Sequence, residues 1–263
     1  MIGGGETSSF GKHIFEFIFK RNSLKRIAIL ETPAGFELNS HMVATKIANF
    51  ISNEFYTYNL QVEIIPARKR NTQFSPDDPK IVDVLADIDM VFLGPGSPTY
   101  AVRQLKDSLA WKLIKERHAF GTHLIFSSAA TAAIGKYVIP VYEIYKVGEE
   151  LHWCDGLDLF NLWGQSIVFV PHWNNTDGGN ERDTSRCYIG KNRYDQLANL
   201  LPLNQTVVGV DENTALIIDV FEEICHVIGE GKVIIDHVGQ SESDLQEFIN
   251  GDVFDLAHLF KTK

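Results

Sequence analysis

The chain has 263 residues, 44% of them hydrophobic and 22% charged, and no linker of proline, serine or charge repeats divides it. This length and composition predict a sizeable core and a single globular domain spanning residues 1–263. The formal net charge of −10 and the pI near 5.3 argue against a nucleic-acid or anionic-membrane surface as the main partner.

The cysteines give no sign of a disulfide framework or a metal centre. Cys154, Cys187 and Cys225 lie far apart and lack metal-type spacing. The opening of the chain lacks the basic and apolar regions of a signal peptide. No apolar run approaches the roughly 18 residues that a membrane span needs. We therefore expect a cytoplasmic protein with no metal, no cofactor and no membrane contact.

Short apolar runs alternate with segments of helical periodicity over the first two thirds of the chain. We expect strands at 25–30, 61–65, 90–93, 123–126, 166–170 and 206–210, and helices at 11–20, 40–55, 81–85 and 99–117. This alternation is typical of βαβ units and predicts an α/β fold with a mostly parallel sheet. In such sheets, ligands bind beyond the carboxyl ends of the strands.

Both ends of the chain depart from this alternation. Residues 1–5 have the character of the tail of a first strand and its turn. From Ala215 onward, short strands around Gly229-Glu230-Gly231 predict a C-terminal antiparallel extension. For residues 241–260 we expect one or two amphipathic helices that cover an edge of the sheet.

The most informative stretch is 122–135, THLIFSSAATAAIG, where a strand-like run changes into small residues that suit the start of a helix. A serine on such a sharp turn has the form of a nucleophile elbow. The turn exposes a hydroxyl and directs the backbone N–H groups that follow it toward an oxyanion. An ordinary strand and helix with a seam of small residues explains these residues equally well.

Two further strand-like runs end in polar residues. The run 166–170 leads into Pro171-His172-Trp173-Asn174-Asn175, and the run 206–210 leads into Asp211-Glu212-Asn213. Parallel strands would bring Ser128, His172 and Glu212 to one edge of the sheet. A hydroxyl needs a base to remove its proton, and the imidazole needs an acceptor that orients it. Taken singly, His172 and Glu212 are equally well explained as a loop histidine and a solvated carboxylate.

Two groups of glycines carry weaker signals. Gly94-Pro95-Gly96 could supply a backbone donor to an oxyanion hole, although glycine and proline after a strand more often form only a tight turn. Gly3-Gly4-Gly5 invites interpretation as a nucleotide-binding loop. It lacks both the Lys-Ser/Thr of a P-loop and the full dinucleotide fingerprint, which disfavours that interpretation.

Taken in order, these motifs resemble the aspartyl dipeptidase (dipeptidase E) and cyanophycinase family of serine peptidases, which has the class I glutamine-amidotransferase-like fold. The motifs are Gly-Gly-Gly-Glu, Gly-Pro-Gly-Ser, the Ser-Ala-Ala elbow, Pro-His-Trp-Asn-Asn and Val-Gly-Val-Asp-Glu-Asn, and they cover roughly residues 1–235. The resemblance implies a flavodoxin-like three-layer sandwich and hydrolysis of a small peptide or related amide through an acyl-enzyme.

The resemblance also assigns roles to particular residues. It implies Ser128 as nucleophile, His172 as base and Glu212 as the third member of the triad, with Gly96 and Ala129 at the oxyanion hole. Glu143 ranks second, after Glu212, as the acidic member of the triad, because in some dipeptidases an acidic residue between nucleophile and histidine has been regarded as a triad member. The candidates for substrate binding are Arg182, Arg186, Asn174 and Glu143, with an arginine expected to read an acidic substrate side chain.

The elbow departs from the family pattern Gly-x-Ser-Ala-Gly. Phe126 and Ala130 stand where the two glycines should be, and those glycines permit the strained turn and a close approach of helix and strand. An alternative register places Ala129 at the nucleophile position and predicts an inactive member of the family that acts as a binding or regulatory module. An amidotransferase-like partner that passes ammonia to another subunit is disfavoured, because the elbow has no cysteine.

The loops leave substrate and assembly open. Substrate identity depends on residues 142–155 and 174–190, which one sequence does not determine. The apolar and aromatic segment 137–153 could line the pocket, form a lid or make a homodimer contact. A packed β-hairpin or strand pair is an equally good interpretation of it.

Overall fold

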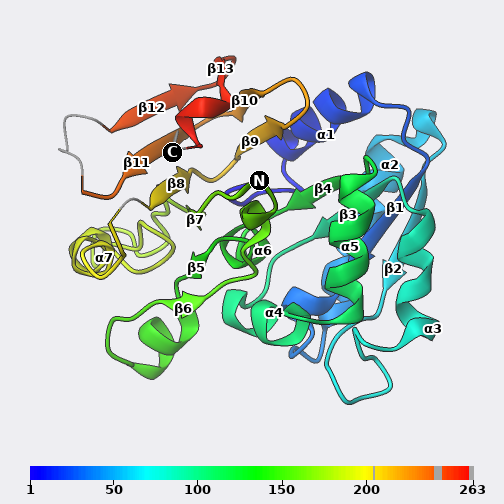
Figure 1. Ribbon diagram of the computed structural model, residues 1–263, viewed down its shortest axis with the longest axis horizontal. Helices are drawn as coiled ribbons and strands as arrows, with labels where there is room; N and C mark the ends of the chain where they lie inside the picture. Colours follow the sequence, from blue (N-terminus) through cyan, green and yellow to red (C-terminus); the bar gives the residue numbers. More distant parts are fainter. Residues whose placement is uncertain (204, 240–244, 261–263) are drawn as a thin grey trace. The chain divides into compact units, whose positions relative to one another are not determined.

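The computed structural model describes residues 1–203, 205–239 and 245–260 (Figure 1). The chain packs into two compact units, which we call the N-unit (residues 6–130) and the C-unit (residues 1–5 and 131–263). The helix α6 (Ala129–Ala133) contains the point where one unit ends and the other begins. The expectation of a single domain for residues 1–263 stays a prediction.

The N-unit is built on a parallel four-stranded sheet in the order β2-β1-β3-β4 (Figure 1). Its strands are β1 (Arg26–Leu30), β2 (Gln61–Ile65), β3 (Met90–Leu93) and β4 (His123–Phe126), and its helices are α1 (Ser9–Arg21), α2 (Ser40–Glu54), α3 (Pro79–Val82), α4 (Pro98–Leu105) and α5 (Leu109–Ala119). This strand order is that of the flavodoxin-like fold, in which ligands bind outside the carboxyl ends of the strands.

Aromatic contacts show that helices cover both faces of this sheet. Phe92 of β3 stacks on Phe15 of α1 with ring centroids 6.1 Å apart, and Phe15 also contacts Phe50 of α2. Phe126, one register position further along on β4, faces Trp111 of α5 at 6.5 Å. Because successive strand residues point to opposite faces, α1 and α2 cover one face and α5 the other. The result is a three-layer arrangement.

The C-unit is mainly antiparallel. Its elements are β5 (Tyr137–Val138), β6 (Cys154–Asp155), β7 (Ile167–Val170), α7 (Lys191–Ala198), β8 (Thr206–Val210), β9 (Thr214–Asp219), β10 (Ile224–Gly229), β11 (Lys232–His237), β12 (Gln246–Ile249) and β13 (Val253–Asp255). The strands form the sheets β12-β11-β8-β7, β13-β10-β9 and β5-β6. Only β7 and β8 run parallel among the strand pairs described in this unit. Their carboxyl ends therefore lie side by side.

The α/β class, the parallel sheet and the antiparallel C-terminal extension are confirmed. The strands expected at 61–65 and 90–93 have those bounds. The helix expected at 99–117 is two helices, because Asp107 adopts a positive φ of 61° and Ser108 caps α5. The helices expected at 241–260 are wrong for the part that is described, which contains β12 and β13, while 241–244 lie outside the described residues.

Candidate functional site

Ser128 occupies a sharp turn between a strand and a helix of the elbow segment. It follows β4 by two residues, α6 begins at the next residue, and its φ is 52°. A positive φ is uncommon for a residue with a side chain and persists only where the surroundings impose it. The helix begins at Ala129, which leaves Ser128 at the turn, so this geometry does not favour the alternative register.

The two departures from the family elbow are accommodated by packing. Phe126 is 1% exposed and makes an edge contact with Trp111, so its side chain lies in the core of the N-unit as an ordinary strand residue. Ala130 is also buried, and its amide donates to the carbonyl of Ser127 at 3.0 Å. The positive φ at Ser128 is therefore compatible with phenylalanine and alanine at the two glycine positions.

The serine before the turn is held by an acidic residue that the sequence analysis did not single out as a site residue. Ser127 is fully buried, and its hydroxyl donates to Oε2 of Glu6 at 2.8 Å. The amide of Ser127 donates to the carbonyl of Leu93 at 3.0 Å, which extends the pairing of β4 with β3 by one step. These two bonds fix the backbone that enters the turn at Ser128.

The loop after β3, which contains Gly96, is fixed against the loop after β1. Gly96 has a φ of 147°, and a Cβ there would lie 2.0 Å from the carbonyl oxygen of Pro33. The amide of Ser97 donates to that same oxygen at 2.9 Å. Only glycine fits this approach, so the position expected at the oxyanion hole is conformationally constrained.

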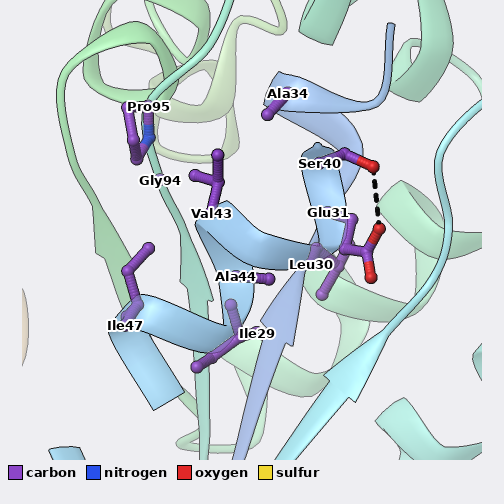
Figure 2. Close-up of a pocket in the computed structure, with 10 residues that line it drawn as sticks. All are labelled: Ile29, Leu30, Glu31, Ala34, Ser40, Val43, Ala44, Ile47, Gly94 and Pro95. Atoms are coloured by element: carbon purple, nitrogen blue, oxygen red, sulfur yellow. Dashed lines mark hydrogen bonds between the residues drawn. The ribbon is translucent and has the colours of Figure 1, made fainter. Parts of the chain in front are cut away.

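A small apolar pocket lies beside this loop, between β1 and α2 (Figure 2). The empty space among its lining atoms, which includes open solvent, is about 200 Å³. Its lining residues are Ile29, Leu30, Glu31, Ala34, Ser40, Val43, Ala44, Ile47, Gly94 and Pro95. The carboxylate of Glu31 is its main polar feature, and the hydroxyl of Ser40 donates to it at 3.1 Å, as Figure 2 shows.

His172 and Glu212 form a hydrogen-bonded pair in the C-unit. Each follows one of the two parallel strands β7 and β8, and Nδ1 of His172 lies 2.6 Å from Oε1 of Glu212. A carboxylate only accepts, so the proton of this bond is on Nδ1 and Nε2 is left as the basic nitrogen. The bond from His172 holds the pKa of Glu212 below its usual range, outweighing the opposite effect of burial.

Two asparagines hold the carboxylate and its backbone. Nδ2 of Asn175 donates to Oε1 of Glu212 at 2.7 Å, and Asn175 is only 2% exposed. Oδ1 of Asn174, expected to bind substrate, accepts from the amide of Glu212 at 2.8 Å. The side chain of Asn174 thus braces the loop that carries Glu212. Sequence analysis did not select Asn175 as a site residue, and its only signal was its position three residues after His172, as the second asparagine of the Asn-Asn pair.

The two candidate arginines have different surroundings. The exposed guanidinium of Arg182 lies over the ring of Tyr145 at 4.6 Å and hydrogen-bonds to its hydroxyl. Arg186 lies over Trp173 at 3.9 Å and donates to the carbonyl of Trp173 at 2.9 Å. Burial lowers the pKa of Arg186. Arg186 is thus engaged in packing, while Arg182 presents its charge at the surface.

The second-ranked acid, Glu143, belongs to a different loop. It begins the π-helical turn Glu143–Val147, between β5 and β6, and its carbonyl accepts from the amides of Gly148 and Glu149. The carboxylate that bonds Nδ1 of His172 belongs to Glu212 and not to Glu143. The segment 137–153 contains β5 and this π-helical turn, and the partner of β5 is β6, which lies just beyond the segment.

The residues of the predicted triad belong to two different units of the chain. Ser128, Gly96 and Ala129 belong to the N-unit, and the His172–Glu212 pair belongs to the C-unit. Within the described ranges, no group of histidine, cysteine, aspartate or glutamate side chains is arranged to hold a metal ion. In the same ranges, no helix has the length and apolar character to cross a membrane.

The fold and these strand-end residues define a class of protein, the α/β proteins with a flavodoxin-like strand order and an antiparallel extension. No protein-family model and no curated protein matches the sequence. Among solved structures, a peptidase from an acI-B1 actinobacterium is similar with a TM-score of 0.74 and 19% identity, over 97% of this chain and 94% of that one. A putative peptidase E from Listeria monocytogenes EGD-e is similar with a TM-score of 0.50 and 18% identity, over 88% and 96%. The resemblance to the peptidase E family therefore extends to the fold.

Proposed function

We propose that this protein is a serine hydrolase that cleaves a small peptide or related amide. The observation that carries the proposal is the backbone of Ser128, a residue with a φ of 52° between β4 and α6. Such a turn costs conformational energy, of order 1–3 kcal/mol, and strain of this kind clusters at active sites. The elbow interpretation gives it a purpose, which is to present the hydroxyl at the end of a strand.

In this proposal, Ser128 Oγ attacks the amide carbonyl and Nε2 of His172 takes the hydroxyl proton. His172 then returns the proton to the leaving amine, and water hydrolyses the acyl-enzyme by the same steps. Glu212 keeps the proton of the neutral ring on Nδ1 and stabilises the imidazolium that forms. The 2.6 Å bond between these two side chains supports this assignment. The mechanism requires Oγ of Ser128 to come within hydrogen-bonding reach of Nε2 of His172.

The oxyanion would be held by the backbone amides of Gly96 and Ala129. The amide of Ala129 is the first in α6 and therefore has no acceptor within the helix. Gly96 is held in place by its contact with Pro33. In well-studied hydrolases one such donor contributes about 2.7–4 kcal/mol to transition-state stabilisation.

For the substrate, we propose a small peptide with an acidic side chain, read by Arg182. The two similar solved structures are described as peptidases, which supports the peptide class. Arg182 is the better candidate of the two arginines because it is exposed, whereas Arg186 is packed on Trp173. Cytoplasmic location and a homodimer stay predictions from the sequence.

The test is covalent labelling with a serine-directed fluorophosphonate, followed by mass spectrometry of the labelled peptide. We expect stoichiometric label on Ser128, and a folded but unlabelled Ser128→Ala variant without turnover in a dipeptide screen. That screen compares dipeptides that begin with aspartate with dipeptides that begin with asparagine. Ser52→Ala is the control, because it removes an exposed serine hydroxyl from α2 and should still be labelled at Ser128. Full activity of Ser128→Ala would overturn the proposal.

A further inference from the structure

The glycines near the start of the chain join the two loops that carry His172 and Glu212. The amide of His172 donates to the carbonyl of Gly3 at 3.0 Å, and the amide of Asn213 donates to the carbonyl of Gly4 at 2.9 Å. The amide of Gly3 donates in turn to the carbonyl of Thr214 at 3.0 Å. The backbone of these glycines therefore bonds to both loops within the C-unit.

Neither glycine has room for a side chain. A Cβ at Gly3 would lie 2.1 Å from the carbonyl oxygen of Asp211, and a Cβ at Gly4 would lie 2.6 Å from Cε1 and 3.0 Å from Nδ1 of His172. Gly4 also has a φ of 145°, which side chains disfavour. The bare backbone of Gly4 thus lies directly against the imidazole ring, beside the nitrogen that bonds Glu212.

Aromatic packing also supports this ring. The ring of Tyr188 lies 5.2 Å from that of His172, and the amide of Cys187 donates to the carbonyl of His172 at 3.1 Å. Arg186, Cys187 and Tyr188 all have positive φ, as does His172 itself. Four strained residues persist only where their neighbours impose them, which indicates that the position of this imidazole is closely determined.

We infer that Gly4 is a positioning residue for His172, and that Gly3 and Gly4 together hold the histidine in the orientation that bonds Nδ1 to Glu212. This gives the glycine triplet a role other than nucleotide binding. A methyl group at position 4 would displace the ring or turn it away from Oε1 of Glu212. The expected effect of Gly4 on catalysis rests on the proposed function, whereas its effect on the orientation of the His172 imidazole does not.

The experiment is the Gly4→Ala variant of the full chain, produced with ¹⁵N-labelled histidine. We expect the wild type to show a downfield Nδ1–H resonance of His172, and the variant to lose or shift it. We also expect fluorophosphonate labelling at Ser128 to slow by about 100-fold, the order of loss that a misplacement of about 1 Å can cause. Circular dichroism and a thermal melt report whether the variant is folded.

Gly251→Ala is the matched control. Gly251 has a φ of 91°, and no atom lies within 4 Å of the Cβ position, so alanine adds backbone strain there without a clash. It should leave the imidazole resonance and the labelling rate unchanged. A Gly4→Ala protein that keeps the wild-type resonance would overturn the inference.

Two outcomes need separate treatment. If Gly4→Ala does not fold, a nuclear Overhauser contact between the α-protons of Gly4 and Hε1 of His172 in the wild type decides the matter, and its absence contradicts the inference. If the wild type is not labelled at Ser128 by the fluorophosphonate, the proposed function fails, but the imidazole resonance still tests whether Gly4 orients the ring of His172. The two failures are therefore distinguishable.

Discussion

Replacing Glu31 by alanine should lower the stability of the protein markedly, because this carboxylate is buried and has three partners. Its side chain is 0% exposed and accepts from Nε of Arg68, from Oγ of Ser40 at 3.1 Å and from Nδ1 of His41 at 2.9 Å. Removing one partner of a buried ion pair costs about 3–5 kcal/mol. We expect the lower end, about 3 kcal/mol, because the side chain of Arg68 is 26% exposed and can reach water.

The assay is a thermal melt at pH 7, followed by circular dichroism. For a chain of this length, each kcal/mol shifts Tm by about 2–4 °C, so Glu31→Ala should lower Tm by about 6–12 °C. Glu54→Ala is the matched control, because Glu54 pairs with Lys12 at 2.7 Å but both side chains are more than 40% exposed. Surface pairs contribute little, so this variant should melt with the wild type. Equal shifts in the two variants would refute the reasoning.

The difference should also depend on pH with a definite sign. Burial alone would raise the pKa of Glu31, but the hydrogen bonds from Arg68, His41 and Ser40 outweigh it and hold the pKa below the ordinary value of 4.5. A depressed carboxyl pKa contributes stability above the ordinary value, and this contribution is lost as the pH falls through the folded-state pKa. The gap in Tm between wild type and Glu31→Ala should therefore narrow in acid. A gap that widens in acid would contradict the assignment.

Two further substitutions test the C-unit. Glu212→Gln should slow fluorophosphonate labelling by about three to four orders of magnitude while leaving Tm near that of the wild type. The reason is that an amide at this position in other triads favours the wrong tautomer of the histidine. A labelling rate like that of the wild type would count against the triad. Asp211→Asn should raise Tm at pH 7, because burial raises the pKa of Asp211 and the charged form is therefore costly. Asparagine can still accept from the amide of Lys232, which bonds Oδ2 of Asp211 at 2.8 Å. Its advantage should grow as the pH rises above 3.8, the ordinary aspartate value, and an advantage confined to acid would be the wrong sign.

Strands bounded by clear turn signals were predictable from the sequence, whereas segments whose apolar residues fit two periods were not. Residues 61–65 and 90–93 are short segments rich in apolar residues, followed by proline and glycine respectively, and both are strands with those bounds. Residues 246–255 also fit a helical period, but Gly251 adopts a φ of 91° and ends any helix there. The chain instead passes from β12, paired with β11, to β13, paired with β10. Neither pairing can be seen in the local periodicity of residues 246–255.

The same distinction separates the site residues that were predictable from those that were not. Ser128, His172 and Glu212 each lie two residues past the end of a strand, so chain position was enough to propose them, and their roles stay predictions. Gly4 and Tyr188 could not be selected in this way, because each is identified only by its contact with the imidazole of His172 in the folded chain. A glycine triplet suggests a nucleotide-binding loop when only its own backbone freedom is considered. Here that freedom is used by protein contacts, because the space a Cβ would need is filled by His172 and by the backbone of Asp211. A glycine-rich turn that packs against a histidine at the end of a strand therefore indicates a contact that positions this histidine as readily as it indicates a phosphate-binding site.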